Sequence, residues 1–290
     1  MNAQNNVFLL DEIQRLSAFT FDGSGGNLAG VLLLQHPINK NEMQKMALQI
    51  GYSETAFAHF LGSKKWRVRY FSPFMEVPFC GHATIALGVA LGKRYGESIY
   101  ELELNDGTIT VEAICEEHDQ WKAILLSPQA KTREAPVDLT DAIYHEFGIS
   151  SDQLDHHFST QIAHAGADHL LIGLDDRLRL SQLGYHFGRV KNLMEKAKLV
   201  TICFFHRSGA SLFHTRNFFA SGGVYEDSAT GAATAALAGY LRICGAIERG
   251  EIEIIQGEDM GRKSRIMASF ESDLDGPIRV SGHVSEISLD

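Results

Sequence analysis

The chain has 290 residues, of which 44% are hydrophobic and 21% are charged, a composition that suits one large domain or two of roughly 150 residues. The formal net charge is −10, and the longest basic run covers only residues 64–67. A protein that binds a phosphate backbone needs clustered Lys and Arg, so we expect no nucleic-acid partner. None of the four cysteines forms a Cys-x-x-Cys pair, which leaves a zinc ribbon or a thioredoxin site without support.

The N-terminal segment lacks a basic region followed by an apolar stretch of signal-peptide length. No uninterrupted apolar run approaches the ~18 residues that would indicate a membrane span. From these features we expect a soluble, cytoplasmic protein with reduced thiols and no membrane partner.

The first half of the chain predicts short strands and few helices. The glycine-rich segment 22–27 lacks the Gly-Lys-Ser/Thr ending of a phosphate-binding loop and predicts a tight turn instead. Apolar residues within 43–50 follow the period of an amphipathic helix, and Gly51 is a plausible left-handed cap. We then expect an extended segment, a strand, a hairpin and a further strand, over residues 53–60, 66–71, 101–111 and 123–126.

The second half repeats this mixture. A polar, weakly patterned segment, residues 128–138, is interpreted as an interdomain linker. This gives an N-terminal domain over 1–127 and a C-terminal domain over 139–290, with the last strand able to cross to the first domain. Strands are expected near residues 170–172, 199–205, 212–217, 251–255 and 278–281. Short strands and few helices predict an α+β fold with mostly antiparallel sheets rather than a doubly wound fold.

Two segments of the chain resemble each other at a distance of 150 residues. In each, an Arg-aromatic segment is followed by a loop, a glycine and an almost wholly apolar helix; the glycines are Gly81 and Gly231. Chance similarity between two Ala-rich helices is the alternative, but the shared order of elements favours a duplicated domain. Helix N-termini carry unpaired N–H groups and partial positive charge, so two such starts could hold one carboxylate between them. The alternative is that both glycines only permit close packing.

Four residues near these helix starts or on a nearby strand could carry chemistry. His82 lies beside a helix start, where a His can shuttle protons near neutral pH, although a structural role is the alternative. Asp227 could equally be a plain N-terminal cap. Glu54 would gain a raised pKa if it pointed inward from its strand, and would otherwise be an ordinary solvated Glu. Cys80 invites a nucleophile interpretation, but spacing identifies no basic partner for it.

At these positions the chain resembles the phenazine-biosynthesis isomerase-like (PhzF-like) proteins, which share their fold with diaminopimelate epimerase. The resemblance covers nearly the whole chain, and its motifs are specific in combination. The residues that carry it are Ala18-Phe19-Thr20, Gly26-Asn27, Ala29-Gly30-Val31, Ser53-Glu54-Thr55-Ala56-Phe57, Pro73, Glu76-Val77-Pro78, Cys80-Gly81-His82-Ala83-Thr84, Glu226-Asp227, Ala229-Thr230-Gly231, Gln256-Gly257-Glu258 and Met260-Gly261-Arg262.

The resemblance implies two pseudo-symmetric domains of diaminopimelate epimerase-like fold, each a sheet wrapped around a central helix, with the active site in the cleft between them. It implies an isomerase that needs no cofactor or metal and moves a proton on a small carboxylic acid. Glu54 matches the family's catalytic acid–base, and His82 and Asp227 match its other active-site residues. A homodimer is plausible. The residues expected to bind substrate are Ser53, Gly81, Thr230 and Gly231.

The sequence departs from the family pattern at Ser17, Leu28, Ser228 and Ala232, where Asp, Pro, Pro and Ser are usual. Ala232 removes a hydroxyl that could bind substrate, so the phenazine substrate is not carried over. Related epimerases need two thiols; Cys80 matches one position, but the other holds Ser228, which makes two-thiol epimerisation improbable. Two alternatives remain: a one-thiol racemase or epimerase that uses Cys80, and a non-catalytic small-acid-binding protein on the same scaffold.

Overall fold

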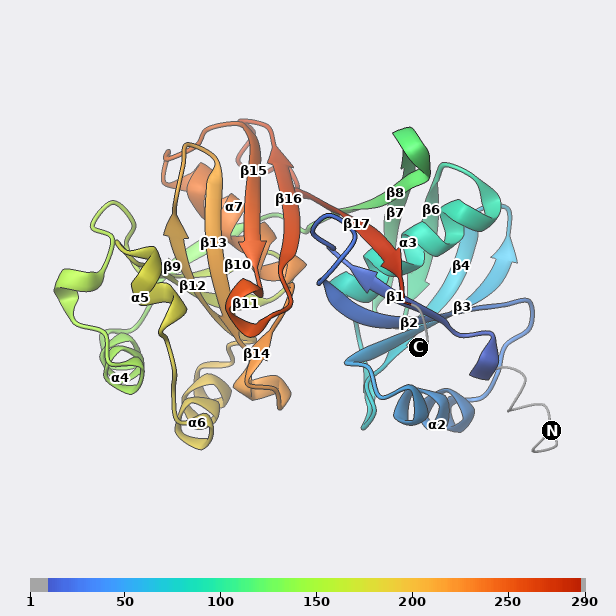
Figure 1. Ribbon diagram of the computed structural model, residues 1–290, viewed down its shortest axis with the longest axis horizontal. Helices are drawn as coiled ribbons and strands as arrows, with labels where there is room; N and C mark the ends of the chain where they lie inside the picture. The colour runs from blue at the N-terminus through green and yellow to red at the C-terminus, as the bar shows by residue number, and fades with distance from the viewer. Residues whose placement is uncertain (1–9, 288–290) are drawn as a thin grey trace. The chain divides into compact units, whose positions relative to one another are not determined.

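The computed structural model describes residues 10–287 (Figure 1). The fold divides into two compact units: the first holds the chain up to Leu126 together with the segment from Ser281 onward, and the second holds Ser127–Val280. Every helix within residues 10–287 is too short or too polar to cross a membrane. The segment 128–138, predicted as a linker, belongs to the second unit and contains strand β9 (Lys131–Glu134), so that prediction is wrong. Most side chains of β9 are exposed, so the strand has a polar sequence without the apolar alternation that predicts a strand.

The first unit is a sheet that closes on itself. Its strands pair in the order β1–β2–β3–β4–β6–β7–β8–β17, and β17 pairs in turn with β1. Most of these pairs are antiparallel, but β2–β3 and β4–β6 are parallel. The short strand β5 pairs with β4. The bounds are β1 Gln14–Ala18, β2 Asn27–Leu34, β3 Glu54–Gly62, β4 Lys65–Phe71, β5 Glu76–Val77, β6 Ser98–Leu104, β7 Gly107–Glu116, β8 Gln120–Leu126 and β17 Arg279–Glu286.

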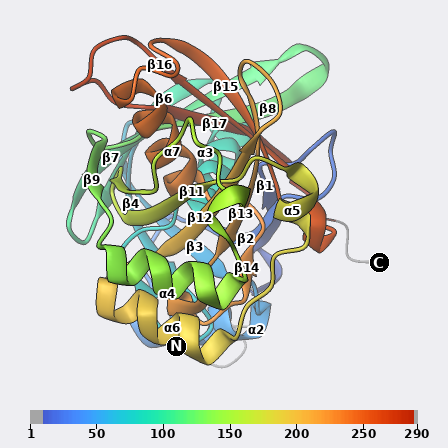
Figure 2. The same ribbon diagram turned by 90° about the vertical axis from the view of Figure 1, so that its left-hand side faces the viewer.

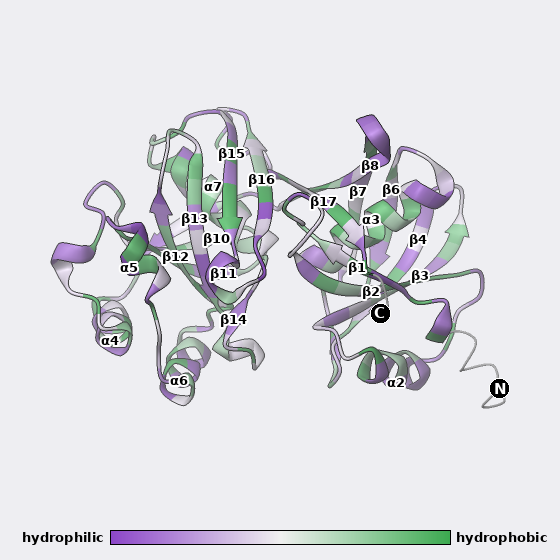
Figure 3. Ribbon diagram, in the orientation of Figure 1, coloured by the Kyte–Doolittle hydropathy of each residue, from purple (hydrophilic) through white to green (hydrophobic). Residues whose placement is uncertain are grey.

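Helix α3 (Gly81–Tyr95) packs against β1, β2, β3, β6, β7 and β8 of this closed sheet (Figure 1). A helix that is hydrophobic all round must be buried, and residues from His82 to Gly92 are. Figure 3 shows hydrophobic residues along this helix. A Cβ on Gly88 would lie 2.6 Å from Val111, so glycine lets the helix approach the sheet. The amphipathic helix α2 (Lys40–Ile50) packs its apolar face on β3 and β4.

In the second unit a sheet likewise packs on a central helix, α7 (Gly231–Ile243), which contacts β9, β10, β11 and β16. Its strands pair in the order β9–β10–β11–β12–β13–β15–β16, and the short strand β14 pairs with β13. The two helices α4 (Val137–Phe147) and α6 (Phe187–Ala197) pack side by side (Figure 2). The other bounds are β10 Gln161–His164, β11 Asp168–Gly173, α5 Arg177–Ser181, β12 Thr201–Arg207, β13 Leu212–Phe218, β14 Glu226–Asp227, β15 Gly250–Gln256 and β16 Ser264–Phe270.

The pairing pattern confirms the duplication predicted from the sequence. In the first unit β2–β3 is parallel, β3–β4 and β4–β5 are antiparallel, β4–β6 is parallel and β6–β7 is antiparallel. In the second unit β11, β12, β13, β14, β15 and β16 repeat this pattern in the same chain order. The central helix follows the short strand in both units. The α+β fold with two pseudo-symmetric units is therefore confirmed.

The repeated Arg-aromatic segments hold the short strand that leads into each central helix. Arg69 donates from Nε and Nη2 to the two carboxylate oxygens of Glu76, at 2.7 and 2.7 Å. Arg216 makes the same bidentate pair with Glu226, at 2.9 and 2.6 Å. The guanidinium carbon of Arg216 also lies 4.9 Å from the ring centroid of Phe218, within the range of a cation–π contact. The duplicated residues thus fix the approach to each helix start.

Several local predictions are confirmed. The helix over 43–50 is part of α2, and Gly51 ends it at φ 71°. Residues 22–27 contain the predicted turn, in which Phe21 and Ser24 exchange two backbone hydrogen bonds. The predicted hairpin is β6–β7, with Leu104 opposite Gly107. Strands β1, β2, β10 and β16 and helices α4, α5 and α6 were not predicted.

Candidate active site

Three chemically active side chains of the first unit converge at the start of α3. Glu54 opens strand β3, Cys80 is the N-cap residue of α3, and His82 lies in its first turn. Glu54 Oε2 lies 3.3 Å from His82 Nε2 and 3.6 Å from Cys80 Sγ. The Cys80 sulfur lies 3.4 Å from His82 Nδ1. The side chains of His82 and Glu54 are 9% and 17% exposed, so the group is buried but within reach of solvent.

Hydrogen bonds orient the His82 ring. Asn27 Nδ2 lies 3.3 Å from His82 Nδ1, and since an amide nitrogen donates, Nδ1 accepts. The neutral ring then carries its proton on Nε2, which faces both Glu54 Oε2 and, at 3.1 Å, Ser53 Oγ. Asn27 was not predicted as a site residue, although it stands in the Gly26-Asn27 motif of the family resemblance. The arrangement directs one proton of the imidazole toward the Glu54 carboxylate.

The protein environment makes Glu54 a stronger base than an exposed glutamate. Burial raises the pKa of Glu54 from its ordinary value, and hydrogen bonds from Ser53 and Cys80 offset only part of that effect. A general base works best when its pKa lies close to the working pH. Of the two orientations considered from the sequence, the partly buried one is therefore the one observed.

The start of α3 leaves room beside its backbone. The side chain of the N-cap residue Cys80 makes no cap hydrogen bond, and the first turn of the helix is Gly81-His82-Ala83. Apart from its chain neighbours and the backbone of its own helix, no atom of residues 10–287 lies within 4 Å of the place a Cβ on Gly81 would take, so packing does not require glycine there. Unpaired N–H groups and the helix dipole make such an end attractive to an anion.

The same three side chains offer donor atoms that a metal ion could use. One ligand atom each from Glu54, Cys80 and His82 lie within 4.8 Å of one another, and this is the one such group in residues 10–287. Thiolate, imidazole and carboxylate together suit Zn²⁺. The hydrogen bonds among the three are also what a proton-transfer site needs, so the donor set alone does not call for a metal.

A second polar group lies at the start of α7 in the second unit. Thr230 is the N-cap residue of α7, and its hydroxyl donates to Asp227 Oδ2 at 2.6 Å. Thr230, and not Asp227, holds the N-cap position of α7, and its own side chain makes no cap hydrogen bond. Gln256, at the end of β15, donates from Nε2 to the Asp227 carbonyl at 2.8 Å and to Thr230 Oγ1 at 3.0 Å. Gly231 is the first residue of the helix.

Gln256 was not predicted as a site residue. It is fully buried at the end of the apolar strand β15, and it belongs to the Gln256-Gly257-Glu258 motif of the family resemblance. A buried amide at the end of an apolar strand is a signal that the sequence offered. Gly257 is required beside it, because φ is 73° and a Cβ would lie 2.7 Å from the Ser228 carbonyl oxygen.

A buried histidine lies in the same hydrogen-bonded network. His169 Nδ1 lies 2.7 Å from Thr201 Oγ1, and the Thr201 hydroxyl donates to Asn217 Oδ1 at 2.9 Å. Asn217 Nδ2 donates to Gln256 Oε1 at 3.0 Å. Burial lowers the pKa of His169 to about 4, against a smaller raising effect of Asp168. His169 is therefore neutral across the physiological range.

The lowered pKa of His169 should make the folded protein less stable in acid. Since the unfolded chain binds the His169 proton below pH 6.5 and the folded chain only below about 4, stability is present above pH 6.5 and falls between these values. A shift of this size corresponds to about 3 kcal/mol. His169→Asn retains a donor for Thr201 and should remove most of this pH dependence. Urea unfolding at pH 7 and pH 4.5 checks it; an equally steep acid loss in the variant would contradict the assignment.

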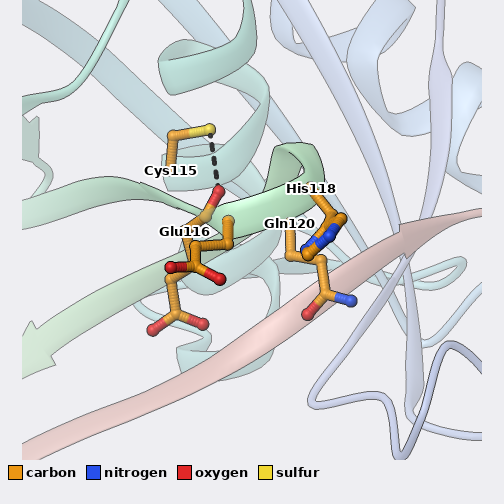
Figure 4. A pocket seen from close by; sticks show the side chains of 5 residues that line it. Cys115, Glu116, His118 and Gln120 are labelled. Atoms are coloured by element: carbon orange, nitrogen blue, oxygen red, sulfur yellow. Dashed lines mark hydrogen bonds between the residues drawn. The ribbon is translucent and has the colours of Figure 1, made fainter.

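A separate pocket lies at the tip of the β7–β8 hairpin (Figure 4). The thiol of Cys115 there donates to the Glu116 carbonyl at 3.6 Å. Burial, and then the carboxylates of Asp119 and Glu97, raise the pKa of Cys115, which disfavours a thiolate. We assign no reaction to this pocket. It is lined by Cys115, Glu116, Glu117, His118 and Gln120.

A sheet wrapped around one buried helix in each of two duplicated units defines the class of diaminopimelate epimerase-like folds. A hydroxyproline epimerase from Agrobacterium vitis shares the fold, with a TM-score of 0.61 at 13% identity over 95% of this chain and 90% of that one. A PhzF-family protein from Bacillus anthracis matches with a TM-score of 0.82 at 20% identity, over 95% of this chain and 96% of that one. These likenesses establish the fold.

The family follows from the sequence comparison. A family model described as phenazine biosynthesis-like protein matches residues 16–287, so the chain belongs to this family. A trans-2,3-dihydro-3-hydroxyanthranilate isomerase from Pseudomonas chlororaphis is 30% identical over 281 residues, 91% of this chain and 92% of that protein. The chain is accordingly an enzyme of the isomerase class.

Proposed function

We propose that this isomerase moves a proton between two carbon atoms of a small carboxylic acid, with Glu54 as the general acid and base. One observation carries the proposal: the Glu54 carboxylate, with its pKa raised by burial, lies 3.3 Å from His82 Nε2 beside the start of α3. The base and a site for an anion thus occur together in one unit. Burial of the base and an open helix end are what proton abstraction from an acid requires.

The reaction balances without an oxidant or a reductant. The ionised Glu54 carboxylate takes a proton from carbon, and the C–H electron pair enters the conjugated system of the substrate. The protonated Glu54 then returns a proton to a different carbon, which completes the isomerisation and restores the carboxylate. His82 donates a hydrogen bond from Nε2 and Ser53 orients its ring. The backbone around Gly81 binds the substrate carboxylate.

Asp227, Thr230 and Gly231 are proposed to take part in the same reaction, Asp227 in proton transfer and the other two in binding. The support is the family resemblance at these positions together with the polar group at the start of α7. We propose no resident metal or cofactor, and turnover should survive dialysis against a chelator. The homodimer expected from the sequence stays a prediction, which light scattering of the purified chain tests.

The experiment that tests the proposal is solvent exchange. The protein is incubated in heavy water with a panel of cyclic and unsaturated carboxylic acids that includes trans-2,3-dihydro-3-hydroxyanthranilate, on which the relative named above acts. Deuterium uptake and isomer formation are followed by mass spectrometry and NMR. Uptake that depends on Glu54 supports the proposal. Saturable binding of an acid without uptake would favour the alternative of a non-catalytic binding protein.

A one-thiol racemase or epimerase is the second candidate, because the Cys80 thiol lies within 3.6 Å of both Glu54 and His82. If Glu54 is the base, Cys80→Ala should retain turnover within about tenfold, since it removes hydrogen bonds to Glu54 and His82 but leaves the base itself in place. If Cys80 is the base, the variant and alkylation of the thiol should each abolish turnover. Turnover of the Cys80→Ala and Glu54→Gln variants, measured side by side, decides between the two.

A further inference from the structure

The hydrogen bonds around Gln256 have directions that two backbone groups determine. Its Oε1 accepts from the Thr230 N–H at 3.2 Å, and its Nε2 donates to the Asp227 carbonyl at 2.8 Å. A backbone N–H can only donate and a carbonyl can only accept, so the orientation of the Gln256 amide is fixed. Every other bond to this amide must agree with that orientation.

From Gln256 the chain of bonds leads to the Asp227 carboxylate. Gln256 Nε2 also donates to Thr230 Oγ1 at 3.0 Å, which makes that hydroxyl an acceptor. The single hydroxyl proton of Thr230 is then directed to Asp227 Oδ2 at 2.6 Å. Oδ2 is thereby held as the acceptor of the Thr230 hydroxyl proton, which fixes the orientation of the Asp227 carboxylate relative to Thr230.

In the opposite direction the network is equally constrained. Because Gln256 Oε1 is an acceptor, Asn217 must present Nδ2 to it, which leaves Asn217 Oδ1 to accept from Thr201. The single hydroxyl proton of Thr201 is therefore donated to Asn217. The Thr201 oxygen can then only accept from His169, which must donate from Nδ1. These buried donors all point toward Asp227. Such chains of hydrogen bonds polarise one another, so each bond strengthens the next.

The first unit supplies an independent parallel. Tyr70 is the middle residue of Arg69-Tyr70-Phe71, as Asn217 is of Arg216-Asn217-Phe218. The Thr84 hydroxyl donates to the Cys80 carbonyl at 2.7 Å, so Tyr70 must donate to Thr84, at 2.6 Å. In both units the middle residue of the repeated segment therefore anchors the residues just before the central helix.

We propose that Gln256, supported by Asn217, is a positioning residue that restricts the Thr230 hydroxyl to Asp227 and so presents Asp227 for proton transfer. This inference rests on the proposed function, because it assigns Asp227 a part in the reaction. Gln256 acts only through Thr230 and Asp227. Its loss should lower kcat and leave KM nearly unchanged, since misplacing a catalytic group costs mainly rate.

The test uses two variants and one control in the full chain. Gln256→Met removes every hydrogen bond of the amide, while Gln256→Glu keeps an acceptor for the Thr230 N–H and loses the donor whenever its carboxyl group is ionised. Thr215→Val is the control. The Thr215 hydroxyl also donates to Gln256 Oε1, but at 3.4 Å this is the longest of the hydrogen bonds to the Gln256 amide. Kinetics of deuterium uptake and hydrogen exchange of the Thr230 backbone amide are measured for all three.

The proposal predicts that kcat falls by about 10- to 100-fold in both Gln256 variants and by less than about twofold in Thr215→Val. In Gln256→Glu the loss should diminish at lower pH, where the carboxyl group regains a proton to donate. If Gln256→Met fails to fold, Gln256→Glu decides alone. An unchanged kcat in a folded Gln256 variant would overturn the proposal.

Amide exchange separates the failure of this inference from the failure of the proposed function. The Thr230 amide should exchange faster in Gln256→Met than in Thr215→Val, whether or not a substrate is found. Equal protection in the two variants would overturn the inference. If the protection is lost as expected and the native chain moves no proton on any acid, the positioning stands and the proposed function fails.

Discussion

Replacing Glu54 by Gln is expected to lower turnover by roughly 10²- to 10⁴-fold, the range that a positioned general acid–base contributes. The amide keeps the size and hydrogen-bonding capacity of the side chain but cannot accept a proton from carbon. KM should change little, because the helix start that binds the substrate carboxylate is intact. In the native enzyme, turnover should rise with pH through the raised pKa of Glu54, since the base must be ionised.

The same substitution should make the protein more stable at neutral pH. The pKa of Glu54 is higher in the folded chain than its ordinary value of 4.5. The protonated group therefore favours folding at pH values below 4.5, and this contribution is lost as the pH rises through the folded-state pKa. Glu54→Gln removes the cost of a buried charge, so its melting temperature should exceed that of the native chain at pH 7 and equal it below about pH 4. A variant with native turnover, or one that melts lower at pH 7, would count against this role of Glu54.

Replacing Glu226 by Gln is expected to destabilise the second unit by about 3 kcal/mol or more. The Arg216 and Glu226 side chains are only 8% and 4% exposed, and removing one partner leaves a buried charge uncompensated. Three backbone carbonyls, those of Leu180, Ser181 and Leu183, still accept from Arg216 Nη1, which limits the loss. Urea unfolding at pH 7 measures the effect.

The duplicated pair in the first unit provides the matched control. Glu76 binds Arg69 in the same bidentate geometry, but Arg69 is 23% exposed and Lys40, the other cation on Glu76, is 60% exposed. Both cations can turn to water when the carboxylate is lost. Glu76→Gln should therefore cost only about 1 kcal/mol. Equal losses from the two substitutions would show that burial does not govern the strength of these pairs.

The sequence allowed the fold to be predicted where local pattern and tertiary structure agree. The apolar period of residues 43–50, Gly51 after them and the repeat around Gly81 and Gly231 all correspond to observed elements. Strand β9 was not predicted because its polar side chains are mostly exposed, and it is recognised as a strand by its pairing with β10. The periodicity of a short segment does not show which distant segment it pairs with.

The site could be predicted in part. Glu54, His82 and Cys80 were named separately, but periodicity could not tell which way Glu54 points; that depends on burial at the start of α3. Asn27 and Gln256 were missed as site residues because their roles arise from bonds across 55 and 26 positions of the chain. Asp227 is a different case. Its position just before a helix suggests a cap, but in the structure its carboxylate accepts a hydrogen bond from the Thr230 hydroxyl.

The two central helices show how a duplicated scaffold acquires different chemistry. The Arg–Glu pair and the anchoring middle residue are retained in both units, with Tyr70 in one and Asn217 in the other. The residues at the helix start have diverged, to Cys80 and His82 in one unit and to Asp227 and Thr230 in the other. The repeat therefore maintains the architecture, while the polar residues that differ are available for function.

The most direct measurement is deuterium incorporation into a small carboxylic acid in heavy water, by the native chain and by Glu54→Gln at equal concentration. Mass spectrometry reports the number of deuterium atoms and NMR their carbon positions. Glu54-dependent proton transfer predicts deuterium at the carbon that gains a proton in the native reaction, and almost none with the variant. Equal incorporation by both proteins would contradict the role assigned to Glu54.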